Sequence, residues 1–363
     1  MDSLTQIALG AAVGELTLGR KIGYKAALWG GLAGTLPDLD VLFGLFLDPV
    51  DYLHIHRGFS HSVFFAFLVA PVLALLVTRF FNPPETTYKD WLKLFFLTLF
   101  THPFLDLLTG YGTQIFNPIT DYAFEVNSIF IIDPLYTVPL LTSIFLAVRL
   151  PRKHPRRLFW IKSGLGVTSV YLALTILLKS LALPVFKAEL DRQGIEYERM
   201  MTVPGPFSSL LWRALVETEE GYYQGTYSLL DDGNQPIRFY YLPRNEHKIA
   251  GIAQSKAVQR LLWFSKGFYH VNEIDGELYF NDLRFGSYNS WTGEHSSFIF
   301  AFRLDELEDG SVGFEQVQMP VEIRLSDFSQ LVRRTMGNTT VYLPETAVMT
   351  VQQGSVTAEA VRQ

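Results

Sequence analysis

Hydrophobic residues gather into long uninterrupted stretches in the first half of this 363-residue chain, whereas apolar and polar positions alternate in the second half. A helix needs about 20 apolar residues to cross the hydrocarbon core of a bilayer. Four stretches meet that length, at about 61–81, 91–109, 129–150 and 158–183. The pattern predicts four membrane-spanning helices at these positions.

Two weaker apolar stretches precede these four. The stretch 24–47 contains the sequence PDLD at residues 37–40 and must therefore be interrupted or partly sheltered. The stretch 4–18 is short and polar at two places, and its Glu15 is expected to serve in helix packing or at the membrane interface. Glycines spaced four residues apart favour close helix contact, and both stretches carry such a pair, Gly10 with Gly14 and Gly30 with Gly34. We therefore predict a membrane bundle of about six helices over residues 1–183, its first two packed as a hairpin.

Residues 184–363 are predicted to form a second domain, outside the membrane. Asp-Gly turns between alternating apolar runs predict β-hairpins at 222–242 and 269–283. Short helices are expected at 256–264 and 326–334. The predicted fold class is thus a membrane α-helical bundle followed by an α+β or mostly β extracytoplasmic domain.

Composition and charge narrow the class of protein. The chain is 48% hydrophobic and 18% charged, against about 25% charged residues in a typical soluble protein. Residues 184–363 hold 16 Lys+Arg and 24 Asp+Glu, a net charge of −8. Binding to nucleic-acid phosphates needs clustered positive charge, so no nucleic-acid partner is expected. The chain has no cysteine, which excludes disulfides and thiolate metal ligands.

Basic residues predict how the bundle is oriented. The links at 20–25, 79–93 and 149–162 together hold 12 of the 14 Lys and Arg in residues 1–183. Loops rich in Lys and Arg stay in the cytoplasm. The N-terminus, the loop at 48–60 and everything after residue 183 are therefore expected on the outer side of an inner (cell) membrane that the chain crosses several times.

Acidic and histidine side chains gather at the predicted outer end of three stretches. These are Asp38 and Asp40 in PDLD, the sequence HIHRGFSHS at 54–62, and His102 with Asp106 in THPFLD. Residues four apart share one face of a helix, so His102 and Asp106 can approach one ion together. Imidazole and carboxylate suit Zn²⁺, and also Mn²⁺ or Fe²⁺. A divalent metal, zinc first, is the predicted cofactor.

A purely structural interpretation of these residues is available. Asp38 and Asp40 could cap a broken helix, and His102 and Asp106 could pair with each other. Against this, ionisable groups at membrane depth cost about 2.5–3.5 kcal/mol each on insertion scales and usually mark function. The group as a whole therefore favours a metal site.

The same residues carry a family resemblance. MDSLTQIALGAAVGE, GTLPDLDVL, HRGFSHS, THPFLDLLTGYGT and IIDP follow one another over about residues 1–135 and resemble the YdjM-like family of membrane-bound metal-dependent hydrolases. The resemblance implies a bundle distantly similar to the zinc-dependent phospholipase C fold, with a clustered metal site. The family pattern implies as metal ligands Asp38, Asp40, His61, His102 and Asp106, with His56 as a ligand or substrate contact.

One position departs from the family pattern. Family members often carry a histidine near the N-terminus where this chain has Gln6. Glutamine is a poor metal ligand, so the resemblance does not carry a second metal site over to this position.

Hydrolysis is the reaction that this set of residues favours. A metal lowers the pKa of bound water toward about 7 and polarises a phosphoryl or carbonyl oxygen. Of Asp38 and Asp40, one would bind the metal and the other, assigned as Asp40, would take the proton of the water. Arg57 would hold a phosphate or a developing oxyanion, or remain a solvated loop charge. Ser60 and Ser62 are expected to cap the helix that follows.

The location of the site suggests its partners. At the outer membrane–water boundary, the expected substrate is a lipid or a lipid-linked phosphate or ester. Two rival functions remain open: a transporter of metal ions or protons, and a membrane anchor with a structural metal that presents a partner-binding domain. A closed four-ligand site would favour the last of these, and an open coordination position would favour the hydrolase.

The charge pattern makes a prediction about topology. We expect the loops at 20–25, 82–90 and 150–157 to be cytoplasmic and residues 184–363 to be outside. The measurement is a reporter fused after residue 183, with a fusion at residue 153 as the control of opposite location. If a reporter that works only in the cytoplasm were active when fused after residue 183, the prediction would be contradicted.

Overall fold

The computed structural model describes residues 1–81, 84–287, 298–307, 309–317 and 325–341. It divides the chain into two compact units. The first is Met1–Leu177 with Pro206–Ser208, and the second is Leu178–Gly205 with Ser209–Gln363.

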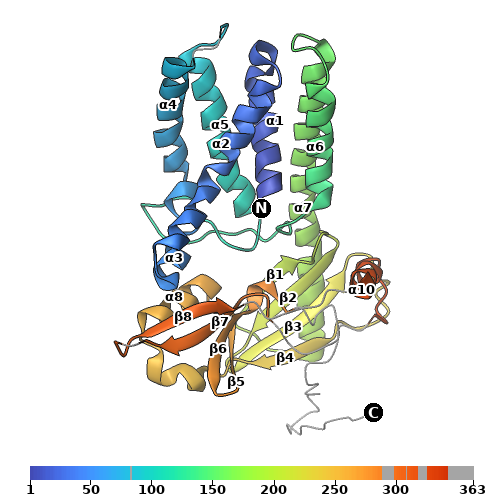
Figure 1. Cartoon of the computed structure of the whole chain (residues 1–363). Coiled ribbons are helices and arrows are strands. Elements are labelled where there is room, and N and C mark those ends of the chain that lie inside the picture. Colours follow the sequence, from blue (N-terminus) through green and yellow to red (C-terminus); the bar gives the residue numbers. More distant parts are fainter. Residues whose placement is uncertain (82–83, 288–297, 308, 318–324, 342–363) are drawn as a thin grey trace. The chain divides into compact units, whose positions relative to one another are not determined.

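The first unit is a bundle of helices that stand side by side (Figure 1). Its main helices are α1 (Ser3–Ile22), α2 (Lys25–Thr35), α4 (Val63–Phe80), α5 (Tyr88–Leu107), α6 (Pro134–Val148) and the first part of α7 (Pro155–Gln193). By length and composition, α4 and α7 are candidate membrane spans, and α6 is a shorter apolar helix. The helical region that the sequence predicts is therefore confirmed, with two candidate spans within it.

Glycine sets the distance between α1 and α2. A Cβ atom on Gly10 would lie 2.3 Å from the carbonyl oxygen of Gly30, and one on Gly14 would lie 2.2 Å from that of Ala26. Both separations are shorter than any real Cβ contact, so a side chain at either position would force the helices apart. This confirms the close hairpin that the glycine spacing predicts.

The PDLD sequence ends α2 and starts a different geometry. Proline lacks a backbone N–H and so cannot continue the hydrogen bonds of an α-helix, and α2 ends at Thr35, two residues before Pro37. A 3₁₀ helix, η1 (Pro37–Leu45), follows. The chain then forms α3 (Pro49–Ile55), which the sequence analysis does not foresee, and η2 (Phe59–His61) before α4. The predicted interruption of the second stretch is thus confirmed.

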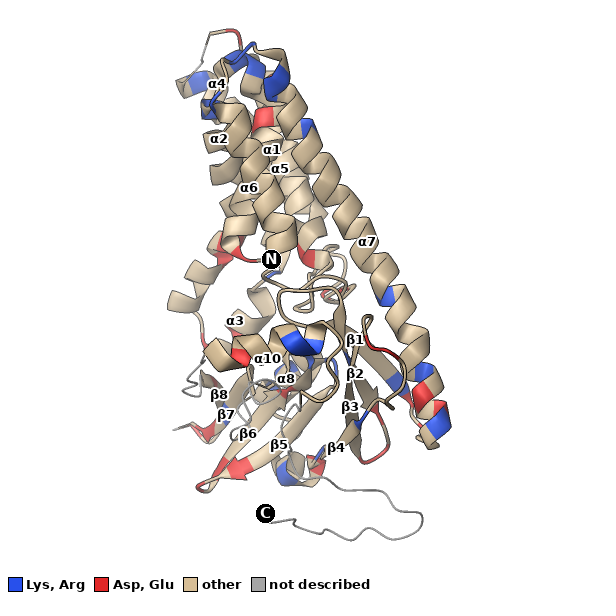
Figure 2. Cartoon of the chain, turned by 90° about the vertical axis from the view of Figure 1, so that its right-hand side faces the viewer, with Lys and Arg blue, Asp and Glu red and all other residues tan. Residues whose placement is uncertain are grey.

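A buried ion pair lies at the end of the bundle away from the PDLD sequence. Glu15 on α1 and Arg157 on α7 are both buried, and an Nη of Arg157 donates to Glu15 Oε2 at 2.9 Å. Arg157 also donates to the Leu150 carbonyl. The packing role expected for Glu15 is therefore confirmed, and its partner is a residue of the basic link. Lys and Arg gather at this end of the bundle (Figure 2).

The described residues of the second unit form two antiparallel four-stranded sheets, each in sequential order. The first comprises β1 (Arg199–Pro204), β2 (Leu211–Glu217), β3 (Gly221–Ser228) and β4 (Phe239–Pro243). The second comprises β5 (Tyr269–Ile274), β6 (Glu277–Asp282), β7 (Ala301–Glu306) and β8 (Val312–Val317). Its helices include η3 (Glu246–Ile252), α8 (Lys256–Ser265), η4 (Leu283–Phe285) and α10 (Leu325–Thr335). The α+β class and both predicted hairpins, β3–β4 and β5–β6, are confirmed.

The last apolar stretch is longer than predicted. It was expected to end at residue 183, but α7 continues to Gln193. Its final turns bury Ala182, Phe186 and Leu190, which are spaced four apart, against Trp212 and Val216 of β2. Packing against a sheet extends the helix beyond its purely apolar part, and local hydrophobicity does not reveal this.

His270 on β5 is held as a neutral imidazole. Its Nδ1 donates to the Pro243 carbonyl at 2.7 Å. Burial lowers the pKa of His270, and this hydrogen bond opposes the shift only in part. The folded-state pKa of His270 lies below the ordinary value of about 6.5, so protonation favours the opened strand. The contribution of the neutral His270 to the stability of β5 is therefore fully present above about pH 6.5 and declines as the pH falls below it.

We therefore expect β5 to open more readily at pH 5 than at pH 8. Hydrogen exchange of the β5 amides in the full chain, corrected for intrinsic rates, measures this. His270→Gln keeps a donor for the Pro243 carbonyl but cannot titrate, so it is the control and should lose the pH dependence. An identical pH dependence in both proteins would contradict the assignment.

The Glu15–Arg157 pair gives a stability prediction. Arg157→Ala leaves a buried carboxylate without its partner, a change that typically costs about 3–5 kcal/mol. We expect a large drop in the unfolding temperature of the detergent-solubilised protein. Arg156→Ala removes an exposed neighbouring charge and should change it little. Equal losses in the two variants would show that the pair does not stabilise the bundle.

Candidate metal centre

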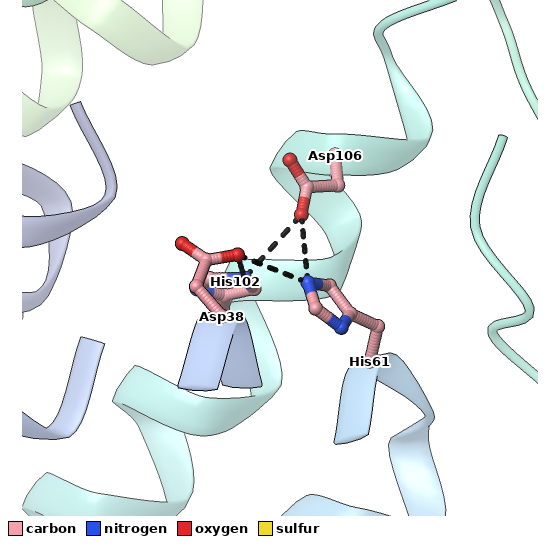
Figure 3. A group of neighbouring side chains, drawn as sticks. All are labelled: Asp38, His61, His102 and Asp106. Atoms are coloured by element: carbon pink, nitrogen blue, oxygen red, sulfur yellow. Dashed lines mark hydrogen bonds and ion pairs between the residues drawn. The ribbon is translucent and has the colours of Figure 1, made fainter. Parts of the chain in front are cut away.

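Four side chains from three segments converge at one end of the bundle (Figure 3). Asp38 lies at the start of η1, His61 ends η2, and His102 and Asp106 lie on α5. Each offers one possible ligand atom, and these four atoms all lie within 4.8 Å of one another. We call these four residues the cluster.

The distances within the cluster are nearly uniform. Asp38 Oδ1 lies 3.2 Å from His61 Nε2 and 3.4 Å from His102 Nε2. Asp106 Oδ2 lies 3.4 Å from His61 Nε2 and 3.3 Å from His102 Nε2. Each carboxylate oxygen thus faces both imidazole nitrogens, as expected of atoms that surround a common point.

Local backbone geometry explains how three separate segments meet. His102 and Asp106 are four residues apart on α5, so the helix places them on one face. The break at Pro37 turns Asp38 toward α5. The Ser62 hydroxyl caps α4 by accepting a hydrogen bond from the Phe65 N–H, and this turn holds His61 at the N-terminus of that helix.

The burial of the cluster favours a bound cation. The side chains of His61, His102 and Asp106 are at most 1% exposed, whereas that of Asp38 is 22% exposed. Both His102 Nε2 and Asp106 Oδ2 are buried, and within the described residues their side-chain partners are the ion-pair contacts of the cluster, at 3.3–3.4 Å, with no well-aligned hydrogen bond. Buried polar atoms without good hydrogen bonds are costly, and one divalent ion would bind both atoms. Two imidazole nitrogens and two carboxylate oxygens are ligands that fit Zn²⁺, Mn²⁺ or Fe²⁺.

The second nitrogen of each imidazole has its own partner outside the cluster. His102 Nδ1 donates to the Gly34 carbonyl at 2.9 Å. His61 Nδ1 lies 3.0 Å from Ser60 Oγ and 3.4 Å from Asp40 Oδ2. Hydrogen bonds of this kind fix ring orientation and tautomer in metal-binding histidines, and here they direct both Nε2 atoms into the cluster.

Asp40 and His56 lie next to the cluster but outside it. Asp40 Oδ2 accepts the Arg57 N–H at 2.8 Å and the Ser60 hydroxyl at 3.1 Å, and its Oδ1 pairs with His56 Nδ1 at 2.9 Å. From the sequence, Asp40 is predicted to be a metal ligand and His56 a ligand or a substrate contact. In the structure Asp40 contacts four residues of the 56–61 loop, where it pairs with His56 and supports His61.

One serine differs from its expected role. The sequence predicts that both Ser60 and Ser62 cap α4. The Ser60 hydroxyl instead contacts Asp40 and His61, and Ser62 is the N-cap residue. Ser60 lies inside the short helix η2, whereas Ser62 directly follows it and so reaches the first turn of α4.

Arg57 is buried against the cluster and is not a solvated loop charge. The residue is 5% exposed, and its backbone takes a left-handed conformation with a φ of 54°. Its Nη1 lies 3.6 Å from Asp106 Oδ1 and 3.4 Å from Thr109 Oγ1. Its guanidinium carbon lies 4.7 Å from the centroid of the Tyr111 ring. A fixed positive charge therefore stands beside the cluster.

Some neighbours of the cluster were not found from the sequence. The Met1 amine pairs with Asp106, and the Gln6 amide donates to the His102 carbonyl at 3.2 Å. Thr109 and Tyr111, beside Arg57, complete this group. Thr109 and Tyr111 belong to the THPFLDLLTGYGT stretch, but their spacing in the sequence does not indicate that they contact Arg57, about 50 residues earlier.

The described part of the second unit contains no comparable group. His247 is exposed, and His270 binds a backbone carbonyl. His295 lies outside the described residues.

Comparison with known proteins places the helical unit in a family. The model of the family described as YdjM inner membrane protein matches residues 1–182. Among curated relatives, the uncharacterized protein YfhP of Bacillus subtilis is 30% identical over 155 residues, which are 40% of this chain and 45% of YfhP. The inner membrane protein YbcI of Escherichia coli is 34% identical over 110 residues, 30% of this chain and 61% of YbcI.

The chain thus spans 45% and 61% of the lengths of these two relatives. No solved structure matches. The family match covers every residue of the cluster, together with Asp40, His56 and Arg57. The chain is a member of the YdjM inner membrane protein family.

Proposed function

We propose that this protein is a membrane-bound, metal-dependent hydrolase that acts at the outer face of the inner membrane, on a phosphate or ester bond of a lipid or lipid-linked substrate. The observation that supports this most is the convergence of two carboxylates and two imidazoles within 4.8 Å, at one end of a bundle of an inner membrane family. Zinc is the metal we expect, with manganese or iron as alternatives.

The cluster would hold the metal, and the residues around it would serve the reaction. A bound metal of this kind supplies a Lewis acid and lowers the pKa of a coordinated water. Asp38 is the most exposed member of the cluster and marks the side open to a substrate. Arg57 would bind an anionic group of the substrate or a developing oxyanion.

Asp40 would act through His61 and the loop. Three donors already occupy its two oxygens, so it is poorly placed to bind the ion directly. We propose that it holds His61, and that His56 stands at the rim of the site. Asp38 directs Oδ1 at both imidazoles, so its other oxygen, Oδ2, is then the better candidate to accept a proton from the attacking water.

The distribution of acids supports the hydrolase over a transporter. A path for ions or protons would need acidic or histidine groups leading through the bundle. At the other end of the bundle, Glu15 is engaged by Arg157 at 2.9 Å. The acidic and histidine side chains that converge within 4.8 Å thus lie at one end of the bundle, away from this ion pair.

Removing one cluster residue should remove the metal and the activity together. We expect the purified wild type to carry about one divalent ion and His102→Ala to carry almost none, since even losses outside the ligand set cost about 10–100-fold in affinity. Elemental analysis and hydrolysis of long-chain phosphatidic acid and of p-nitrophenyl esters measure the two effects. His154→Ala, on the basic link, should change neither. A metal-loaded wild type that hydrolyses neither class of bond would contradict the hydrolase proposal.

Asp40 should tune metal affinity and leave the ligand set intact. We expect Asp40→Asn to weaken metal binding by about 10–100-fold and to leave a site that refills at high metal concentration. Metal titration with a competing chelator measures the affinity. Asp48→Asn removes a nearby carboxylate but keeps a side chain able to cap α3, and should bind metal normally. Loss of binding in Asp40→Asn that excess metal cannot restore would indicate direct ligation.

A further inference from the structure

The part of η1 beyond Asp40 is an apolar projection. Asp40 itself is 3% exposed, but the residues that follow turn outward. Their exposed fractions are 51% for Leu42, 53% for Phe43, 74% for Leu45 and 83% for Phe46. No charged residue occurs between Asp40 and Asp48. Both whole-chain views show the following helix, α3, beyond the N-terminal end of α1 (Figures 1 and 2).

Aromatic contacts connect this projection to Asp40, which lies next to the cluster. A Cβ atom on Gly44 would lie 3.3 Å from the ring of Tyr52 on α3, so the backbone of η1 packs against that ring. The Tyr52 ring stacks on His56 with 5.6 Å between centroids. His56 in turn pairs with Asp40 at 2.9 Å. The same short helix thus carries a cluster residue at its first turn and an apolar surface along the rest.

We infer that the outward face of η1 holds the hydrocarbon chain of an amphiphilic substrate whose polar group reaches the cluster. This inference rests on the proposed function and names the part of the substrate that η1 would recognise. We call Leu42, Phe43, Leu45 and Phe46 the η1 face.

The membrane setting favours a lipid chain as the occupant of this face. Contiguous exposed apolar side chains mark a lipid, ligand or protein contact, and an inner membrane protein is surrounded by lipid. The nine residues of η1 extend about 16–18 Å at the 3₁₀ rise of about 2 Å per residue. A chain lying along the face would therefore begin near Asp38. The buried positive charge of Arg57 beside the cluster fits an anionic head group.

Photo-crosslinking tests where the chain lies, without requiring turnover. The probe is phosphatidic acid with a diazirine in its acyl chain, added to the full-length protein in detergent. We expect labelling at residues 39–46 that excess phosphatidic acid suppresses about tenfold and excess diacylglycerol does not. Asp38→Asn should reduce this competed labelling. Labelling of η1 no stronger than that of the exposed apolar residues of α4, and not competed, would overturn the inference.

A specificity ratio provides the second arm. For Phe43→Ser/Phe46→Ser we expect the ratio of kcat/KM for long-chain phosphatidic acid to that for p-nitrophenyl phosphate to fall about tenfold, since apolar contact drives binding of the chain. Phe67→Ser on α4 removes an equally exposed ring and should leave the ratio unchanged. An unchanged ratio in the double variant would overturn the inference. If the wild type cleaves neither substrate, the proposed function fails, and the crosslinking result decides the inference on its own.

Discussion

The mutual placement of two carboxylates and two imidazoles determines how the end of this bundle is built. Asp38, His61, His102 and Asp106 bring their ligand atoms within 4.8 Å of one another, and three of the four side chains are almost fully buried. Groups that water would otherwise solvate are costly to bury without partners. The Gly34 carbonyl and the Asp40 carboxylate supply such partners to the histidines or their loop. The break at Pro37 and the helix cap at Ser62 fix the positions of Asp38 and His61.

The fold supports this arrangement from both ends. The glycine contacts between α1 and α2 bring the helix that precedes Asp38 close to its neighbour. Away from the cluster, the buried Glu15–Arg157 pair joins α1 to α7. The second unit builds its own cores around its sheets. Among the described residues it contains no similar group of ligand-type side chains, so the family-matched unit is the one that carries the candidate chemistry.

The sequence predicts what depends on local spacing. The i,i+4 relation places His102 and Asp106 on one face, the proline marks the break before Asp38, and the Asp-Gly pairs mark the β-hairpins. It does not separate Asp40 and His56 from the cluster, because their placement depends on contacts between Asp40 and a loop about 16–21 residues later in the chain. Nor does it reveal the Glu15–Arg157 pair or the full length of α7, since both depend on residues distant in the chain. Arg57 was found as a candidate, but its burial beside Asp106 is visible only in three dimensions.

X-ray absorption at the metal edge of the purified, metal-loaded protein tests the central claim most directly. The account predicts one zinc with two imidazole nitrogens and carboxylate oxygens at about 2.0–2.2 Å. For His61→Ala, which should hold metal only when it is loaded at high metal concentration, the account predicts one imidazole ligand fewer, and for His56→Ala it predicts an unchanged number. A bound metal without imidazole scattering, or with its histidine ligands unaffected by loss of His61, would contradict it.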